Sequence, residues 1–251
     1  MMSRGSGSHL TGKRLRYAPE NSENEEAWTR ALVARLLIVV AGGVGSRLGR
    51  AEPKALVPLA GRALVARTLD AFLPLSFARV VVCAPADRVS AMAALLGAGV
   101  SVVPGGETRS GSVRRGFDAA APDDTDIVAV HDAARPFLSS EEIVGVLREA
   151  ELVGASIAAT PVVDTIKRSA GGRIVETVDR SDLWAAATPQ AFRGGVLRRA
   201  LASGEDATDE AALCERLGIP VAIVPVSRFA FKITTPEDLA LAEAIVARRK
   251  K

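Results

Sequence analysis

The sequence has few of the residues that disulfide frameworks and metal sites need. Its 251 residues include only two cysteines, Cys83 and Cys214, which lie far apart and in no C-x-x-C spacing. Such cysteines support neither a disulfide framework nor a zinc site. Both are therefore expected to fill space in the core as small apolar side chains.

Aromatic residues are also scarce, with seven Phe, two Trp and one Tyr. The net charge of +3 comes from the two ends, because residues 1–35 hold six basic against four acidic side chains and residues 248–251 add four positive charges. Residues 36–247 are left with a net charge of about −3. A slightly acidic body with few stacking side chains does not suit polynucleotide binding, so no nucleic-acid partner is expected.

Long apolar runs are missing as well. The longest, "ALVARLLIVVAGGVG" at 31–45, is interrupted by Arg35 and then by glycines, and it is shorter than the roughly 18 apolar residues of a membrane-spanning helix. It also comes late, after "ENSENEEAW", which is unlike a signal peptide. We expect a cytoplasmic protein with no membrane partner.

The chain divides by composition at its N-terminal end. Residues 1–33 are rich in Ser, Gly, Asn, Glu and Arg and show no apolar period, which predicts a mobile extension. Residues 34–251 are then expected to form the functional domain.

From residue 36 onward, short β-branched runs alternate with longer helical patterns. "LLIVVA", "RVVVCA", "VSVV", "DIVAVH" and "ASIAAT" predict strands, and the segments between them predict helices. Because the strands are continuously apolar, both faces of their sheet should be covered by helices. The predicted fold class is α/β, with a doubly wound, mostly parallel Rossmann-like sheet.

Residues 161–187 break this rhythm. Two strand-like pieces with charges between apolar positions flank the turn signal "SAGG", which predicts a hairpin outside the parallel sheet. A lone two-stranded ribbon is marginally stable in water. We therefore expect a projecting β-arm that reaches a second subunit; a flap folded onto its own domain is the alternative.

The last part of the chain predicts two helices within 193–218, a strand in "VAIVPV", a short strand in "RFAFKIT" and a final helix. The final helix should begin at Pro236 with Thr234 or Thr235 as its cap.

The loop after the first strand, "AGGVGSRLG", carries chemistry. It fails the dinucleotide fingerprint, because Leu48 stands where the third glycine belongs, and it lacks the Gly-Lys-Ser/Thr ending of a Walker loop. Its glycines still let backbone N–H groups converge on an anion, and Arg47 and Lys54 follow at distances that allow them to close over the same charge. This pattern predicts a triphosphate-binding loop.

Two further loops follow predicted strands, where ligands bind in doubly wound sheets. In "PGGETRSGSV" the hydroxyls of Ser110 and Ser112 could read a base edge or cap the next helix. In "HDAARPF", Asp132 could hold Mg²⁺ or a sugar hydroxyl and Arg135 could grip a phosphate. His131 is expected to pack or to hydrogen-bond rather than to act as a base.

Seven motifs together carry a specific resemblance. They are "AGGVGSRLG…PKALVPLAGRAL", "PGGETRSGSV", "HDAARP", "DTIKR", "TVDRSDLW…TPQAF", "TDEA" and "KITTPEDLALAE", and the match that they carry covers residues from about 36 to 247. In this order they resemble the 2-C-methyl-D-erythritol 4-phosphate cytidylyltransferases of the non-mevalonate isoprenoid pathway. The resemblance implies a homodimer with a projecting arm, CTP as co-substrate, Mg²⁺, and direct attack of the methylerythritol phosphate on the α-phosphorus of CTP.

The resemblance also implies roles for individual residues. Arg47 and Lys54 would stabilise charge on the α- and β-phosphates, and Arg180 and Lys232 would position the attacking phosphate. The cytidine side would use the backbone of Ala41, Gly42, Gly106 and Glu107, the Ser112 hydroxyl, and Asp132, which could also lie near Mg²⁺. The methylerythritol side would use Ala133, Arg135, Thr165, Thr188 and Thr208. Thr165 and Arg180 would cross the dimer on the arm.

Two positions depart from the family pattern, and rival functions remain. Glu107 stands where relatives often have Asp, and Gly42 where many have Ala; both contacts are thought to use backbone atoms. The nearest rival is a cytidylyltransferase for ribitol 5-phosphate or another polyol phosphate. An NAD-dependent oxidoreductase would require the missing third glycine and an acid ending the second strand, and a non-catalytic nucleotide-binding module would not need Lys54, Arg180 and Lys232.

Overall fold

The computed structural model describes residues 33–43, 45–48 and 52–249, and of Ser46 and Arg47 it describes the backbone alone. The predicted N-terminal extension therefore lies outside the described residues, apart from Val33. In the part of the chain that is described, no helix is long and apolar enough to cross a membrane.

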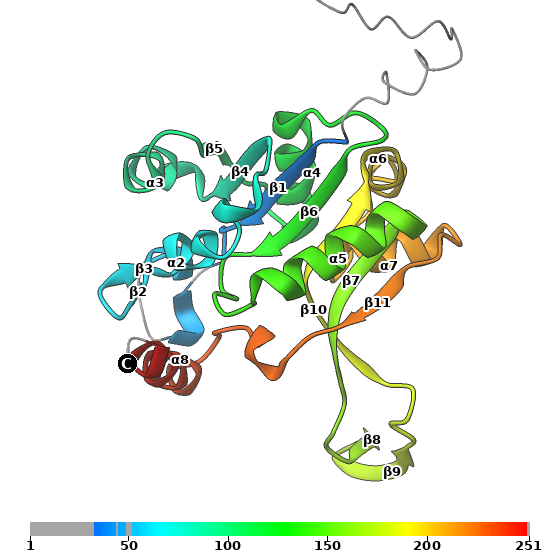
Figure 1. The fold of residues 1–251 in the computed structure, drawn as a ribbon. Helices are drawn as coiled ribbons and strands as arrows, with labels where there is room; N and C mark the ends of the chain where they lie inside the picture. The colour runs from blue at the N-terminus through cyan, green and yellow to red at the C-terminus, as the bar shows by residue number, and fades with distance from the viewer. Residues whose placement is uncertain (1–32, 44, 49–51, 250–251) are drawn as a thin grey trace, which may run out of the picture. The chain divides into compact units, whose positions relative to one another are not determined.

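A seven-stranded sheet forms the centre of the domain (Figure 1). Its strand order is β11-β7-β10-β6-β1-β4-β5. The strands are β1 (Arg35–Val40), β4 (Arg79–Ala84), β5 (Ser101–Pro104), β6 (Ile127–Asp132), β7 (Ala155–Pro161), β10 (Trp184–Arg193) and β11 (Ala222–Pro225). All of them except β10 coincide closely with the predicted strands, so the α/β doubly wound fold is confirmed.

Helices cover both faces of this sheet. They are α2 (Leu64–Asp70), α3 (Val89–Leu96), α4 (Arg109–Ala120), α5 (Ser140–Val153), α6 (Gly194–Leu201) and α7 (Glu210–Arg216). β1 explains the layering, because Leu37 and Val39 pack in the cluster with α2, α3 and α5, whereas Leu36 and Ile38 pack in the cluster with α4, α6 and α7. Alternate side chains of a strand point to opposite faces, so a continuously apolar strand has two buried faces.

β10 is the strand that sequence reasoning missed. It pairs antiparallel with both β6 and β7, while the other strand pairs in the sheet are parallel. Its first residues, 184–187, fall within the range predicted for the arm. The sheet is thus mostly parallel, as predicted, and its antiparallel strand carries the chain back from the arm.

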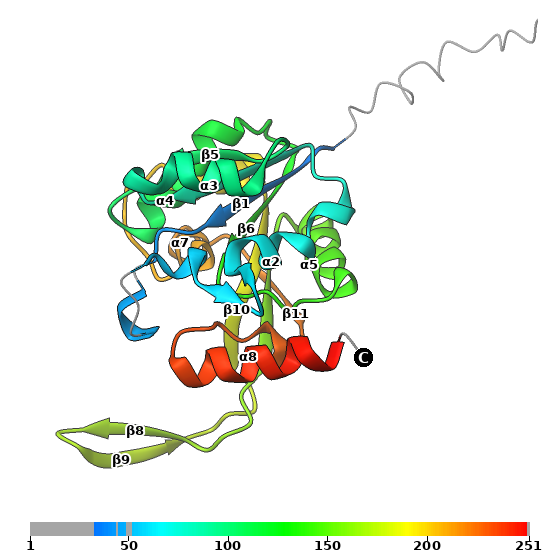
Figure 2. The ribbon, with the colours of Figure 1, turned by 90° about the vertical axis from the view of Figure 1, so that its left-hand side faces the viewer.

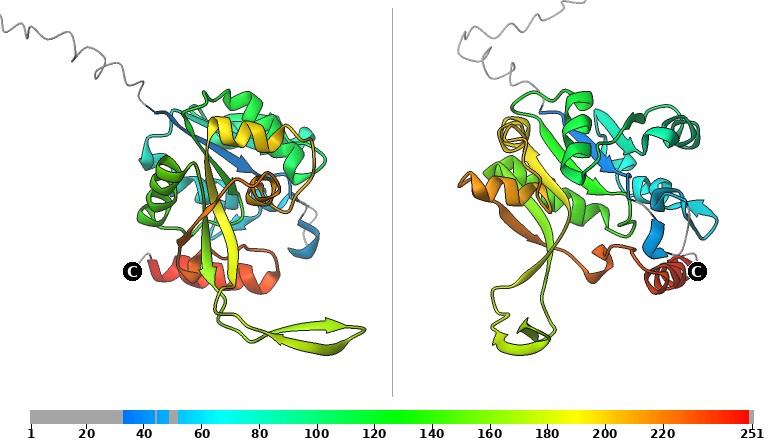
Figure 3. Two further views of the ribbon diagram at one scale, coloured as in Figure 1. Left: turned by 90° about the vertical axis from the view of Figure 1, so that its right-hand side faces the viewer. Right: turned by 180° about the vertical axis from the view of Figure 1, so that it is seen from behind.

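The predicted arm is a two-stranded ribbon made of β8 (Ile166–Ala170) and β9 (Arg173–Val178). Its turn contains Gly171 and Gly172, both at positive φ, a conformation that glycine adopts without strain. The ribbon projects away from the sheet in Figure 2 and in both views of Figure 3. Ile174 and Val175 on β9 are 68% and 60% exposed, so the ribbon leaves apolar surface in water.

Short elements complete the domain. They are η1 (Gly45–Leu48), η2 (Lys54–Leu56), the hairpin β2 (Pro58–Leu59) and β3 (Arg62–Ala63), η3 (Leu73–Leu75), η4 (Ala86–Arg88) and η5 (Arg228–Ala230). The predicted strand in "RFAFKIT" is wrong, since the segment forms η5 followed by irregular chain.

The final helix is α8 (Pro236–Arg249), as predicted. Its cap is Thr235, whose Oγ1 accepts a hydrogen bond from the Asp238 amide while the Asp238 carboxylate accepts from the Thr235 amide. α8 packs on a third apolar cluster that includes Leu59, Phe137 and Ile233. This packing fixes the end of the irregular segment that carries Lys232.

Candidate active site

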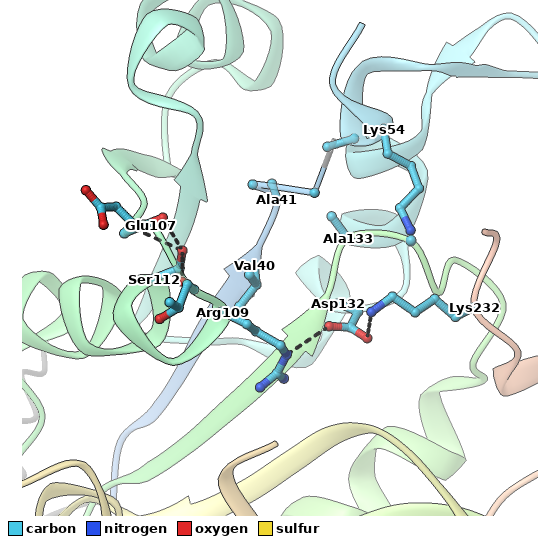
Figure 4. Close-up of a pocket in the computed structure, with 15 residues that line it drawn as sticks. Val40, Ala41, Lys54, Glu107, Arg109, Ser112, Asp132, Ala133 and Lys232 are labelled. Carbon is cyan, nitrogen blue, oxygen red and sulfur yellow. Dashed lines mark hydrogen bonds and ion pairs between the residues drawn. The ribbon is translucent and has the colours of Figure 1, made fainter. Parts of the chain in front are cut away.

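A cleft lies where β1, β5 and β6 end, the edge at which doubly wound sheets bind ligands. Figure 4 shows the residues that line it. They are Val40, Ala41, Gly42, Gly43, Lys54, Ala55, Gly106, Glu107, Thr108, Arg109, Ser112, Asp132, Ala133, Ala134 and Lys232. The three loops singled out in the sequence therefore meet in one place.

The first loop brings Lys54 into the cleft. The Lys54 amide donates to the Gly43 carbonyl at 3.1 Å, which closes the loop on itself. The residue is only 9% exposed and its side chain points into the cleft (Figure 4). A Cβ on Gly43 would lie 3.7 Å from Lys54 Cε, so the lysine stem lies directly along the glycine backbone.

The same loop limits what its backbone can offer a ligand. The Ala41 amide already donates to the Cys83 carbonyl at 2.9 Å, so this donor is taken within the protein. Gly42 is exposed at the cleft. Arg47 belongs to η1, but its side chain lies outside what the structure describes.

The second loop is folded around Ser112. Its Oγ accepts from the Gly106 amide and donates to the Thr108 carbonyl, each at 3.0 Å. A Cβ on Gly106 would lie 2.6 Å from the backbone of Gly111, so only glycine fits there without a shift. The cap of α4 is Thr108, whose Oγ1 accepts from the Gly111 amide. Ser112 thus shapes the loop from within, while Ser110 bonds to the backbone of Ala207.

Asp132, at the end of β6, is surrounded by three cations. Lys232 Nζ lies 2.9 Å and Arg135 Nε 3.3 Å from its Oδ2, and Arg109 Nε lies 3.5 Å from its Oδ1. Burial would raise the pKa of this carboxyl, but the cations, Lys232 most strongly, outweigh burial and hold the pKa well below its ordinary value. Asp132 is therefore an anion throughout the neutral range.

Lys232 is placed by irregular chain and not by a strand. Its side chain is 37% exposed and turns toward Asp132 in Figure 4. A buried or half-buried ammonium needs an anionic partner, and Asp132 is that partner. Its neighbour Ile233 donates its amide to the Ala134 carbonyl at 2.9 Å, which ties the segment to the loop after β6.

Sequence reasoning missed Arg109 and Glu210. Arg109 Nη1 donates to both oxygens of Glu210, at 2.7 and 2.9 Å, and Glu210 is fully buried. Burial alone would lower the pKa of Arg109, but the charges of Glu210 and Asp132 raise it. The available signals were an arginine inside the glycine turn "PGGETRSGSV" and, for Glu210, its place in the motif "TDEA".

His131 and Thr188 form a buried chain behind Asp132. His131 Nε2 faces the Arg135 carbonyl at 3.1 Å, and because a carbonyl only accepts, Nε2 carries the ring proton. Nδ1 is then an acceptor, and the Thr188 hydroxyl donates a hydrogen bond to it at 3.0 Å. The same hydroxyl accepts a hydrogen bond from the Asp132 amide. Burial lowers the pKa of His131 to about 4, so the ring is neutral at neutral pH, as its expected packing and hydrogen-bonding role requires.

The remaining predicted residues fall into two groups. Ala133 lines the cleft and Arg135 lies beside Asp132. Thr165 and Arg180 lie on the exposed arm, and Thr208 is exposed just before α7; none of the three lines the cleft. Arg180 donates to the Val163 carbonyl.

The donor set fits Mg²⁺ only in company with phosphates. Among the described residues, no group of three His, Cys, Asp or Glu side chains could hold a metal ion. Asp132 supplies one ionised carboxylate at the cleft. Mg²⁺ is commonly held by one or two carboxylates together with substrate phosphates, and Asp132 meets that requirement.

This fold and this cleft define a nucleotidyltransferase-type α/β enzyme, in which glycine loops and fixed cations take the place of a Walker motif. A family model for 2-C-methyl-D-erythritol 4-phosphate cytidylyltransferase matches residues 35–248. The chain belongs to this family, and its enzyme class is nucleotidyltransferase.

Relatives and solved structures agree. The chain is 46% identical over 216 residues to a 2-C-methyl-D-erythritol 4-phosphate cytidylyltransferase of Frankia casuarinae, covering 84% of this chain and 80% of the relative. A relative of the same name from Prochlorococcus marinus is 45% identical over 85% of this chain and 98% of its own length. The crystal structure of the enzyme so named from Thermus thermophilus superposes with a TM-score of 0.73 at 36% identity, covering 86% of this chain and 98% of that one.

Proposed function

We propose that this chain transfers the cytidylyl group of CTP to 2-C-methyl-D-erythritol 4-phosphate. A phosphate oxygen of the acceptor forms a bond to the α-phosphorus of CTP, and the bond from that phosphorus to the bridging oxygen of pyrophosphate breaks. The products are 4-diphosphocytidyl-2-C-methyl-D-erythritol and pyrophosphate. Beside the family membership, the observation that carries the proposal is the meeting of Lys54, Lys232 and Asp132 with two glycine loops in one cleft.

Charge stabilisation is assigned to the cations of the cleft. Lys54, together with Arg47 on the same loop, would neutralise charge that develops on the α- and β-phosphates. Phosphoryl transfer is catalysed mainly by positioning and electrostatic stabilisation, and a largely buried ammonium acts more strongly than one in water. Lys232 and Arg180 would position the acceptor phosphate.

Cytosine recognition is assigned to backbone atoms of Ala41, Gly42, Gly106 and Glu107. Two backbone donors of these loops are already used within the protein, since the Ala41 amide donates to the Cys83 carbonyl and the Gly106 amide to Ser112 Oγ. The carbonyl of Ala41 would then accept from the exocyclic amine of cytosine. Ser112 would hold the loop in shape and meet the base only if its internal bonds were exchanged.

The methylerythritol side is assigned to Ala133, Arg135, Thr165, Thr188 and Thr208. Thr188 can act there only as an acceptor, because its single proton bonds to His131. Thr165 and Arg180 would come from the partner subunit's arm.

Mg²⁺ is proposed as the metal, held by Asp132 and the phosphates of CTP. When bound, it would offset negative charge on the phosphate oxygens. The cations around Asp132 keep its carboxylate ionised for this purpose.

A homodimer through the arm is proposed from the ribbon itself. The strands β8 and β9 are almost wholly exposed, and a lone two-stranded ribbon gains stability from a partner. Cys83 and Cys214 are both free and buried, which fits the reducing cytoplasm that we propose as its location.

Pyrophosphate release tests the function directly. Purified enzyme would be given CTP and Mg²⁺ with either 2-C-methyl-D-erythritol 4-phosphate or ribitol 5-phosphate, and the nucleotide product would be identified by mass spectrometry. We expect release with the first acceptor. The family match does not favour ribitol 5-phosphate; preference for it, or release with neither acceptor, would contradict the proposal.

A further inference from the structure

The first turn of α4 is joined to the segment before α7 by three contacts. Thr108 Oγ1 donates to Asp206 Oδ1 at 2.7 Å, Ser110 Oγ accepts from the Ala207 amide at 3.1 Å, and Arg109 binds Glu210. The first contact is exposed, and the second is partly buried. The third reaches from a fully buried carboxylate to a side chain in the wall of the cleft.

Glu210 is itself held in place. Its amide and that of Ala211 both donate to Gln190 Oε1, and Gln190 Nε2 donates to Asp209 Oδ2 at 2.8 Å. Asp209 in turn caps α7. A carboxylate supported in this way sets the position of whatever cation it binds, because its own rotamer is fixed by packing and by its neighbours.

Arg109 uses two of its three nitrogens in these contacts. Nε faces Asp132, and Nη1 forms the bidentate contact with Glu210. Neither contact engages Nη2, and the side chain is 22% exposed. The planar guanidinium is rigid, so fixing Nε and Nη1 also fixes the direction of the Nη2 donors.

Arg109 lies on the nucleoside side of the cleft. In Figure 4, Asp132 separates it from Lys232, while Ser112 and Glu107 lie on its other side. The cations assigned to phosphates, Lys54 and Lys232, come from other loops.

We propose that Arg109 donates from Nη2 to an acceptor oxygen of the nucleoside part of CTP, and that Glu210 is its positioning residue. The inference rests on the proposed function in taking CTP as the nucleotide and in placing its nucleoside part beside Gly106, Glu107 and Ser112. It predicts that Glu210, which touches no substrate, controls nucleotide affinity through Arg109.

The test measures binding of CTP and of CMP by isothermal titration calorimetry, alongside steady-state turnover. Glu210→Gln keeps the shape of the side chain but removes its charge and the contact of both oxygens with Arg109 Nη1. It should weaken the binding of CTP and of CMP by the same factor, about tenfold. The kcat at saturating CTP should change by less than about threefold, because the interaction is equally present in ground and transition states.

Arg109→Lys supplies a second variant at a partly exposed position, in case Glu210→Gln folds poorly. It should show a similar loss, and the double variant should be within about twofold of Arg109→Lys alone, since coupled residues are not additive. Asp206→Asn is the matched control, because it weakens the same junction without touching Arg109; its CTP affinity should stay within about twofold of wild type.

The inference would be overturned if Glu210→Gln left the CTP affinity unchanged, or if the losses of affinity were additive in the double variant. It would also be overturned if Asp206→Asn lost as much CTP affinity as Glu210→Gln, or if the affinity for CTP fell while that for CMP did not. The last outcome would place Arg109 at the phosphates. If wild-type enzyme bound CTP but released no pyrophosphate with 2-C-methyl-D-erythritol 4-phosphate, the proposed function would fail while these binding comparisons still decided the role of Arg109.

Discussion

Lys232 Nζ lies 2.9 Å from Asp132 Oδ2, so a lysine from the irregular chain before α8 meets a carboxylate at the end of β6. This contact presets the ammonium group at the mouth of the cleft. An incoming phosphate would compete with Asp132 for the same lysine, and Arg109 and Arg135 would still balance the carboxylate.

Replacing this lysine should change how stability depends on pH. The pKa of Asp132 is lowered in the folded state, so its contribution to stability is present above the ordinary value of 3.8 and is lost as the pH falls through the lower folded value. Lys232→Met should therefore lower the unfolding free energy by about 1 kcal/mol at pH 7, a modest amount because water screens this partly exposed pair. In the variant Asp132 keeps Arg109 and Arg135 beside it but loses Lys232, so its folded pKa should be less lowered, and the acid-induced loss of stability in urea titrations should begin at a higher pH than in wild type; acid profiles of identical shape would be inconsistent with the assigned contact.

His131 should act in a different pH window and in the same direction. Its pKa falls from 6.5 to about 4 on folding, so only the unfolded chain takes up this proton between those values. Stability is then lost as the pH falls from about 6.5 to 4, by about 3 kcal/mol in total from this residue. His131→Asn should not show this loss. The difference in unfolding free energy between wild type and the variant should therefore narrow by this amount as the pH falls from about 6.5 to 4. If the unfolding free energies of the two proteins differed by the same amount at every pH, folding would not lower the pKa of His131.

Lys54 should matter for turnover and not for folding. Lys54→Ala removes the ammonium that we propose to face the triphosphate, and kcat should fall at least about a hundredfold, as is typical when a transition-state charge contact is lost. Thermal denaturation should be close to wild type. Arg62→Ala, which breaks an exposed ion pair with Asp70, is the control and should retain full activity. Near wild-type kcat in Lys54→Ala would remove Lys54 from the mechanism.

Gly106 should be required for nucleotide binding. In Gly106→Ala the new Cβ would meet the backbone of Gly111 at 2.6 Å, so the loop around Ser112 must move. We expect the KM for CTP to rise about tenfold, with a smaller change in the KM for the acceptor. Gly145→Ala is the matched control, because its Cβ would make only an ordinary 3.6 Å contact with Val224. Similar kinetics for the two variants would argue against base reading by this loop.

Mixing two inactive variants tests whether the arm works across a dimer. Lys54→Ala and Arg180→Ala would be combined, unfolded and refolded together. If Arg180 serves the partner's cleft, each mixed dimer has one intact site, and the mixture should recover about a quarter of wild-type activity, since about half of randomly paired dimers are mixed. If Arg180 serves its own cleft, every cleft of a mixed dimer lacks either Lys54 or Arg180, and no intact site can form. Activity then stays at the level of the separate variants.

Much of this fold and cleft could be predicted from the sequence because local rules determine them. β4 has the predicted limits, and the residues after β1, β5 and β6 form the cleft as the strand-end rule requires. Pro236 and Thr235 marked the start of α8 correctly.

The misses have long-range causes. β10 begins with "WAAATPQAF", whose Pro189 argues against a central strand, and only pairing with β6 and β7 makes it one. "RFAFKIT" is rich in apolar residues but pairs with no strand among the described residues, because packing with α8 positions Ile233 instead. Glu210 lies in the quoted motif "TDEA", but its partner became visible only when the fold placed it against Arg109, 101 residues away in the chain.

The arm leaves the sheet from β7 and returns along β10, and these two strands are hydrogen-bonded neighbours. Both attachment points therefore lie on two paired strands, and the ribbon of β8 and β9 beyond them can be lengthened without changing the path of the core strands. The reach of the arm can thus change while the loops at the strand ends keep their places in the cleft. The same property makes the tip at Gly171 and Gly172 a natural insertion point for a label or a fused peptide.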